Sequence, residues 1–214
     1  MIKVSVVYLI DKKSESMFSE LNDLYSNLMS CSNSFELIIA SFSSDVVLNN
    51  DLNIFCGNRQ YCKFRYSDNK SIRDRLYDIL SYTDYETIIL LNSDVDYHAF
   101  DLDYVLINYT ALKSTSCFAL YECSSSKQKQ INGVVLKHID LINAVNRTNA
   151  KSITEFMLQC CMLHYYIGNV FRLNNRESYF RYKVSSINFS GLKRLRLSFF
   201  LRRCKFIYNS QFKG

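Results

Sequence analysis

The sequence predicts an α/β protein in which a doubly wound, mostly parallel sheet is flanked by helices. Short apolar, β-branched segments alternate with segments of helical periodicity, and short polar links join them. This order is typical of right-handed parallel α/β sheets. A central apolar run in the stretch Thr87–Asp96 leads directly into small and acidic residues. Such a run indicates an interior strand covered on both faces, and parallel sheets bind ligands at the carboxyl ends of these strands.

The first half of the chain supplies most of the predicted sheet. Its expected strands are Ile2–Ile10, Phe35–Ala40, Lys63–Tyr66 and the apolar part of Thr87–Asp96. Ser14 is expected to cap a helix whose apolar residues recur at helical spacing, namely Phe18, Leu21, Leu24, Tyr25 and Leu28. Ser71 is expected to cap a second helix that ends near Tyr82.

The second half is expected to add helices and strands in a less regular order. The predicted helices are Asp101–Lys113 and Ser152–Tyr166, and the predicted strands are Cys117–Glu122, Gly133–Lys137 and Asn169–Leu173. With 214 residues and 48% hydrophobic content, the chain can form one domain with a sizeable core.

Composition excludes several classes of protein. No run approaches the ~18 to 20 apolar residues of a membrane span, and Val4–Ile10 is too short for a signal peptide, so a cytoplasmic location is expected. The eight cysteines form no C-x-x-C motif, and Cys160 and Cys161 are adjacent in an apolar setting. They are therefore expected to be reduced thiols packed as small hydrophobes.

Positive charge is concentrated at the end of the chain. The net charge is +6, but residues 191–214 hold seven Lys or Arg and no acid, which leaves residues 1–190 at −1. The body is therefore not expected to bind nucleic acid. We expect a domain over 1–190 and a basic amphipathic tail over 191–214. Its apolar residues Leu192, Leu195 and Phe199 have the spacing of a helix lying on an anionic membrane surface. Packing on the domain's own acidic surface, or binding a partner, would explain the tail equally well.

Two carboxylates follow the central strand. If the chain stays extended, Asp94 and Asp96 point the same way and can share a divalent cation, and such hard cations also bind phosphate oxygens. The alternative is a solvated acidic loop that caps the next helix. The three histidines, His98, His138 and His164, lack ligand-like spacing, and surface or core roles are expected for them.

Four segments in register resemble the family 2 glycosyltransferases of the GT-A fold, in the branch that serves bacterial surface polysaccharides. The segments are Lys3–Tyr8, Phe35–Ile39 with Ser43-Ser44-Asp45, Ser67–Asp74 and Leu91-Asn92-Ser93-Asp94. The likeness covers about residues 1 to 175 and implies a GT-A-like sheet. It also implies inverting transfer of a sugar from a nucleotide-sugar donor, with a UDP-sugar favoured, to a glycan or lipid-linked acceptor in capsule, O-antigen or similar synthesis.

The resemblance also implies site residues. Mn²⁺ or Mg²⁺ would be held by Asp94 with help from Asp96. Contacts to the donor would come from Tyr8, Ser41, Asp45, Asp68, Arg73, Asp74 and Asn92. Glu155 lies where the family has its catalytic acid motif and would take the acceptor's proton as general base. Both Glu155 and Asp74 stand three residues after a serine, so helix capping explains each without any catalytic role.

The sequence departs from the family at positions that matter for the donor. The aspartate expected at the end of the second strand is replaced by Ala40 or Ser41, and the second aspartate after the central strand is Val95. These departures keep open a catalytically silent GT-A-like subunit or glycan-binding protein. A nucleotidyltransferase ranks lower, because the turn after the first strand, 10–13, has no glycine to cradle phosphates.

Overall fold

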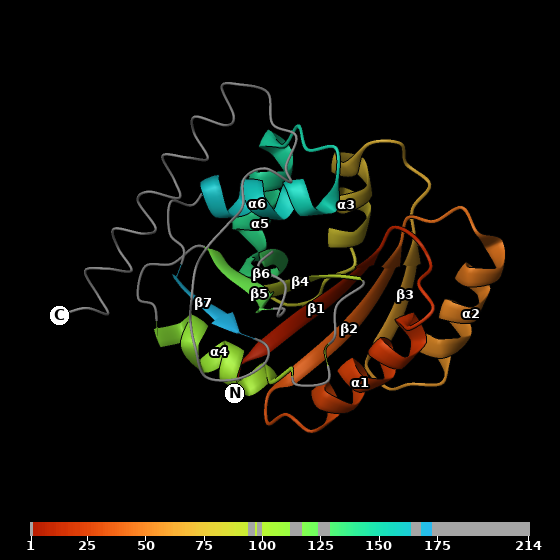
Figure 1. Cartoon of the computed structure of the whole chain (residues 1–214), viewed down its shortest axis with the longest axis horizontal. Coiled ribbons are helices and arrows are strands. Elements are labelled where there is room, and N and C mark those ends of the chain that lie inside the picture. Colours follow the sequence, from red (N-terminus) through yellow and green to blue (C-terminus); the bar gives the residue numbers. More distant parts are fainter. Residues whose placement is uncertain are drawn as a thin grey trace.

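One sheet forms the centre of the protein, and its strands follow the order β3-β2-β1-β4-β6-β5-β7 in the computed structural model (Figure 1). The structure describes residues 2–93, 97, 100–111, 117–123, 129–163 and 168–172. The strands are β1 Lys3–Ile10, β2 Ser34–Ser41, β3 Cys62–Tyr66, β4 Thr87–Asn92, β5 Cys117–Cys123, β6 Lys129–Lys137 and β7 Gly168–Arg172. Pairing is parallel throughout except that β6 runs antiparallel to β4 and β5. The predicted mostly parallel α/β sheet is confirmed.

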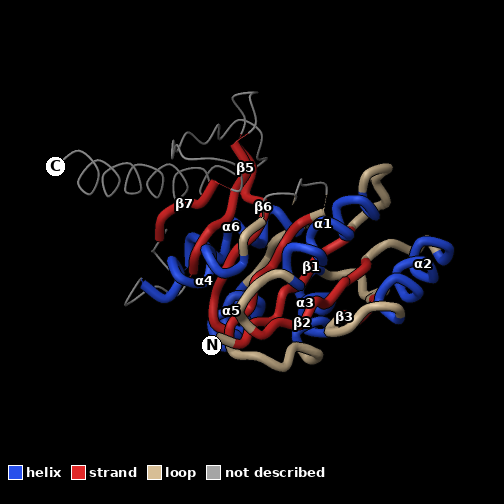
Figure 2. The backbone as a smooth tube through the Cα atoms, turned by 90° about the horizontal axis from the view of Figure 1, so that it is seen from below, coloured by secondary structure: helices blue, strands red, loops and turns tan. Residues whose placement is uncertain are grey.

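Helices cover both faces of the sheet (Figures 1 and 2). They are α1 Met17–Met29, α2 Val46–Gly57, α3 Ile72–Leu80, α4 Leu102–Ala111, α5 His138–Arg147 and α6 Ile153–Leu163. Side chains of α1, α2 and α4 belong to one buried cluster, and those of α3, α5 and α6 belong to the other. The result is a three-layer arrangement with two separate cores.

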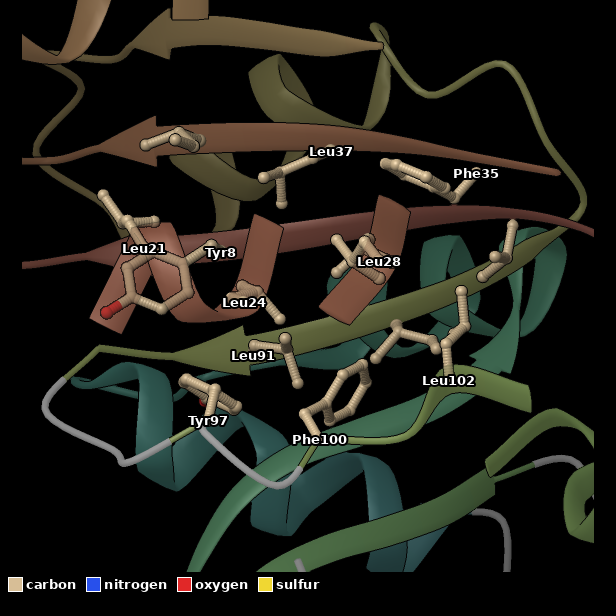
Figure 3. Close-up of a cluster of buried hydrophobic side chains, with 14 of the residues drawn as sticks. Tyr8, Leu21, Leu24, Leu28, Phe35, Leu37, Leu91, Tyr97, Phe100 and Leu102 are labelled. Atoms are coloured by element: carbon tan, nitrogen blue, oxygen red, sulfur yellow. The ribbon is translucent and has the colours of Figure 1, made fainter. Parts of the chain in front are cut away.

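The alternation of side chains along β1 divides the two cores. Val4, Val6 and Tyr8 are fully buried on the α1 side, while Val7 and Leu9 are fully buried on the opposite side. Figure 3 shows the first core, in which α1 lies over β1, β2 and β4. Burial on both faces explains why β1, β2 and β4 are continuous apolar runs rather than alternating ones.

The sequence analysis missed two helices. Asp45 begins α2 by accepting hydrogen bonds at Oδ1 from the backbone N–H groups of Val47 and Leu48, at 3.0 and 3.1 Å. Helix α5 follows β6 without a linker. Both helices are rich in asparagine, which weakens the helical signal, and both are held by the apolar faces that they bury.

The predicted cap of the first helix is wrong in its position. Ser16, not Ser14, precedes the first helical residue, and its side chain makes no capping bond. The Ser14 hydroxyl is buried without a hydrogen-bond partner. The predicted apolar face is confirmed, because Leu21, Leu24 and Leu28 are fully buried.

Within the residues described, no helix is long and apolar enough to cross a membrane.

Candidate functional site

The carboxyl ends of β1 and β4 mark the point where the strand order reverses. Chain-order neighbours β2 and β3 lie on one side of β1, and β4 lies on the other. Beyond the last paired residues, the Ser93 N–H donates to the Leu9 carbonyl oxygen at 3.0 Å. In open α/β sheets, ligands bind outside the strands at such a switch point. The chain therefore brings Asn92 and Ser93, the residues just before Asp94, to the expected ligand crevice.

The ends of β1, β2 and β3 are tied together beside this crevice. The Phe42 N–H donates to the Ile10 carbonyl oxygen at 2.8 Å, and the Ser67 N–H donates to the Ser41 carbonyl oxygen at 3.1 Å. Ser41 is fully buried, and its hydroxyl accepts from the Ser43 N–H at 3.3 Å. The structure thus brings Ser41 close to the loop that carries Asp68, an exposed residue.

Asp45 and Asp74 are both capping residues. Asp45 caps α2, as described above, while Asp74 lies in the first turn of α3. The Asp74 N–H donates to the Ser71 hydroxyl at 3.0 Å, and that hydroxyl donates to Asp74 Oδ2 at 2.6 Å. Both carboxylates are exposed, and local helix geometry accounts for their positions.

Arg73 links two parts of the predicted site that lie far apart in the sequence. Its guanidinium donates to the carbonyl oxygen of Thr148 at 2.9 Å. Thr148 lies in the link between α5 and α6, a few residues before Glu155. The start of α3 and the link before α6 are therefore neighbours, as a shared site would require.

Glu155 occupies a capping position at the start of α6. Its N–H donates to the Ser152 hydroxyl at 3.2 Å, and its Oε2 accepts from the Lys151 N–H at 3.0 Å. The structure thus confirms the capping interpretation of the Ser152–Glu155 spacing. A role as general base is an independent matter and stays a prediction, because a half-buried carboxylate can still accept a proton.

Tyr8 and Asn92 are less available than the sequence predicted. Tyr8 is fully buried, its ring packs edge-on against Tyr97 at 5.8 Å between centroids, and its hydroxyl donates to Glu20 at 3.3 Å (Figure 3). The Tyr97 hydroxyl donates to the Asn92 carbonyl oxygen at 2.6 Å. Tyr8 therefore contributes to the core at the crevice rather than to its surface.

The predicted metal ligands lie outside the described residues. Strand β4 ends at Asn92, and the structure describes neither Asp94 nor Asp96. Elsewhere in the described part of the chain, no group of three or more His, Cys, Asp or Glu side chains could hold a metal ion. Asp94 and Asp96 remain the predicted ligands, and carboxylate oxygens are the donor type that Mg²⁺ and Mn²⁺ prefer. The predicted tail, 191–214, also lies outside the described residues.

The sequence analysis missed a polar network behind the β3 loop. Ser67 is buried and donates to Asp78 Oδ2 at 2.7 Å, and the Asn69 amide donates to the same oxygen. The Arg75 guanidinium donates to the Asn69 carbonyl oxygen and lies over the Phe42 ring. These bonds fix the loop that carries Asp68. No spacing rule links a strand-end serine to an aspartate on the next helix, so the sequence carried no signal for it.

Comparisons with known proteins bear on the fold. No protein-family model matches the sequence, and no curated protein matches it. Solved structures do resemble it. One is the bifunctional IspDF of Campylobacter jejuni, with a TM-score of 0.50 and 12% identity over 73% of this chain. This chain spans 47% of the length of that protein.

Two further structures match over more of their own length. The 4-diphosphocytidyl-2C-methyl-D-erythritol synthase of Anaerococcus prevotii has a TM-score of 0.55 and 10% identity. The match covers 79% of this chain and 85% of that protein. A protein of Desulfovibrio desulfuricans described as a nucleotide-diphospho-sugar transferase has a TM-score of 0.51 and 8% identity, over 77% of each chain. The chain shares their α/β fold. At these identities, the likeness extends to the fold alone.

Proposed function

We propose that the protein is a glycosyltransferase that takes a sugar from a nucleotide-sugar donor, with a UDP-sugar favoured, and moves it to a glycan or lipid-linked acceptor. The observation that supports this most directly is the β1–β4 switch point of the sheet, where the Ser93 N–H bonds to the Leu9 carbonyl oxygen and the next residue in the chain is Asp94. An acidic residue at this position suits a cation that neutralises a diphosphate. The fold shared with a nucleotide-diphospho-sugar transferase agrees with the proposal.

The residues of the chain have separate roles in the proposed reaction. Mn²⁺ or Mg²⁺, held by Asp94 and Asp96, would supply Lewis-acid stabilisation of the leaving diphosphate. Asp68, on the loop after β3, and Arg73, in the first turn of α3, would contact the donor. Glu155 would take the proton of the acceptor hydroxyl as that oxygen attacks the anomeric carbon. The bond between Arg73 and Thr148 holds the start of α3 beside the link that leads into the helix with Glu155.

A second candidate is a catalytically silent subunit or glycan-binding protein with the same fold. The observation that favours it lies at the end of β2, where Ala40 and Ser41 are both fully buried and neither offers a carboxylate to a base. A protein of this kind would keep the crevice but bind nucleotides weakly or not at all.

Thermal-shift measurements separate these candidates, because a ligand that binds only the native state raises the melting temperature. The full chain is heated with UDP, UDP-glucose, CDP or CTP, each with and without Mn²⁺. The proposal expects Mn²⁺-dependent stabilisation by UDP and UDP-glucose in the native chain and in Asp84→Asn, and none in Asp94→Asn, with Asp96→Asn intermediate. Asp84 is a suitable control because it precedes the amino end of β4, whereas Asp94 follows the carboxyl end of that strand in the sequence. The Asp84 carboxylate bonds to Lys63.

Each other outcome points elsewhere. Stabilisation by CTP and not by UDP would replace the proposal with nucleotidyl transfer. Stabilisation by none of the nucleotides would favour the silent subunit. Equal UDP binding by the native chain and Asp94→Asn in the presence of a chelator would refute the assignment of Asp94.

We further propose that residues 191–214 attach the enzyme reversibly to anionic membranes, where lipid-linked acceptors are found. Basic residues near such a surface contribute ~1 kcal/mol each, so the attachment should weaken in high salt. Co-sedimentation with anionic vesicles should therefore recover the full chain and not a chain that ends at Ser190. Equal recovery of both chains, or recovery that high salt leaves unchanged, would contradict the proposed tail attachment.

A further inference from the structure

A pocket lies along the open edge of the sheet, next to the loop that follows β3. Strand β3 is the last strand on this side, and helices α2 and α3 flank it on opposite faces of the sheet (Figure 1). The pocket between them has a volume of about 610 Å³ and is lined by side chains of all three elements. Its size falls in the range of small-molecule sites, ~300 to 1,000 Å³.

Two of the residues that line the pocket each hold one buried polar atom without a hydrogen-bond partner. Nε of Arg65, on β3, is a donor without an acceptor, and Oδ1 of Asn49, on α2, is an acceptor without a donor. The orientation of the Asn49 amide is fixed, because its Nδ2 donates to the Ser43 carbonyl oxygen at 2.9 Å. Both atoms are closed off from solvent, so the part of Arg65 that a ligand in the pocket can reach is the rest of its guanidinium.

The charge of Arg65 is also available to a ligand. Its guanidinium stacks on the Tyr82 ring of the α3–β4 link, with Cζ 3.4 Å from the ring centroid. Across the described ranges, Arg65 forms no ion pair. The carboxylate that lines the same pocket, Asp78, accepts instead from Ser67 and Asn69. A stacked, preorganised guanidinium without a carboxylate partner is suited to an anionic oxygen.

The remaining lining suits hydroxyl groups. Asn50 and Asn53 contribute amides that can both donate and accept, and Tyr66 and Tyr82 are 45% and 41% exposed. A tyrosine ring offers an apolar face and a hydroxyl together. A sugar ring has the matching combination of C–H faces and hydroxyl edges.

We propose that the β3-edge pocket binds an anionic monosaccharide, whose carboxylate or phosphate oxygen bonds to Arg65 and whose hydroxyls bond to the exposed amides of Asn50 and Asn53. The pocket adjoins the loop that carries Asp68, because Ser67 and Asp78 line it, but its occupancy requires neither Asp94 nor a metal. The proposal therefore stands or falls independently of the proposed glycosyl transfer.

The test is calorimetric titration of the full chain with four probes: glucuronate, glucose 1-phosphate, glucose and inorganic phosphate. Binding of glucuronate, of glucose 1-phosphate or of both, each tighter than glucose and phosphate, is the expected result. Glucuronate alone would identify sugar acids as the ligand class, and glucose 1-phosphate alone would identify sugar phosphates.

Three variants connect the binding to the pocket. Arg65→Gln removes the guanidinium and should weaken binding ~10-fold or more, as expected for one charged hydrogen bond. Asn53→Asp changes an exposed residue of α2 and places a carboxylate at the pocket. This carboxylate should repel the anionic ligand and weaken its binding, so the variant tests recognition of the anion even if Arg65→Gln fails to fold. Arg147→Gln, an exposed arginine on α5, is the matched control and should bind as the native chain does.

Absence of binding by both anionic sugars at millimolar concentration would overturn the proposal. Unchanged binding in both Arg65→Gln and Asn53→Asp would also overturn it, because the ligand would then lie elsewhere. Phosphate that binds as tightly as glucose 1-phosphate, with no binding of glucuronate, would refute recognition of the sugar.

Discussion

The Lys63 ammonium lies 2.6 Å from a carboxylate oxygen of Glu36, a buried acidic residue near the amino end of β2. Glu36 Oε1 also accepts from the Ser5 hydroxyl at 2.5 Å and from the Asp84 N–H at 2.6 Å. The Glu36 side chain thus joins β1, β2, β3 and the link before β4 at one point. These bonds lie near the amino ends of the strands, where they tie neighbouring strands together.

Removing Lys63 should destabilise the protein more than removing an ordinary surface lysine. Lys63→Met leaves the 4%-exposed Glu36 without its cation. Because Lys63 itself is 39% exposed, the expected loss is about 1–2 kcal/mol, between the effects of exposed and buried pairs. The matched control is Lys137→Met, whose partner Glu86 is 3.5 Å away and 76% exposed, and it should change the free energy of unfolding very little. Urea denaturation measures both variants. Equal losses of unfolding free energy would mean that the Lys63–Glu36 pair stabilises the protein no more than an exposed ion pair does.

The same pair predicts how stability depends on pH. Burial alone would lower the pKa of Lys63, but its bonds to Asp84 and Glu36 outweigh burial and raise that pKa. The Lys63 hydrogen bond lowers the pKa of Asp84. The stabilisation from Lys63 is therefore complete below its ordinary pKa of ~10.4 and is lost as pH rises through the raised value. The stabilisation from Asp84 is complete above its ordinary pKa of ~3.9 and is lost as pH falls through its lowered pKa.

The difference in unfolding free energy between the native chain and Lys63→Met should consequently form a plateau between about pH 4 and pH 10 and shrink on both sides. Urea denaturation across the pH range tests this profile. A difference that stays constant into acid would contradict the contribution of Asp84.

Cys56 and Cys62 are expected to form a disulfide under oxidising conditions. Both are free thiols in the structure, and their sulfur atoms are 3.2 Å apart, so a bond requires an approach of only ~1 Å. The hydrogen bond with Cys62, and burial, raise the pKa of the Cys56 thiol, so little thiolate exists at neutral pH and oxidation should accelerate as pH rises. Diamide would accept the two electrons and two protons that the thiols release.

Peptide mapping by mass spectrometry should find the Cys56–Cys62 cross-link as the main product among the four thiols that the structure describes, and Cys56→Ser should abolish it. A dominant cross-link to Cys31 or Cys160 instead would contradict the observed sulfur–sulfur contact.

Glu155 can be tested separately as a cap and as a base. Because glutamine serves at the same capping position, Glu155→Gln should keep the stability of the native chain, whereas Glu155→Ala and Ser152→Ala should each lose ~0.5 to 1 kcal/mol. If Glu155 is the general base, Glu155→Gln should also lower turnover ~100-fold with donor binding unchanged. Release of UDP from the donor measures turnover. Near-normal turnover in Glu155→Gln would assign the base to another carboxylate.

The sequence by itself determined the features that depend on neighbouring residues. The apolar runs predicted β1, β2 and β4 because a strand buried on both faces needs apolar residues at every position. The spacing from Ser71 to Asp74 and from Ser152 to Glu155 predicted two caps, since a capping bond spans three residues. The position of Asp94 after the central strand predicted where a ligand crevice should lie.

Only the tertiary structure decided which distant residues meet. It placed Tyr8 in the core, set β6 antiparallel beside β4, and brought Lys63 to Glu36 and Arg73 to Thr148. It also assembled the β3-edge pocket from Asn49, Arg65 and Tyr82, which no local spacing connects. These relationships follow from strand order and from the packing of helices on each face. Both depend on burying apolar surface across the whole chain, which no short stretch of sequence specifies.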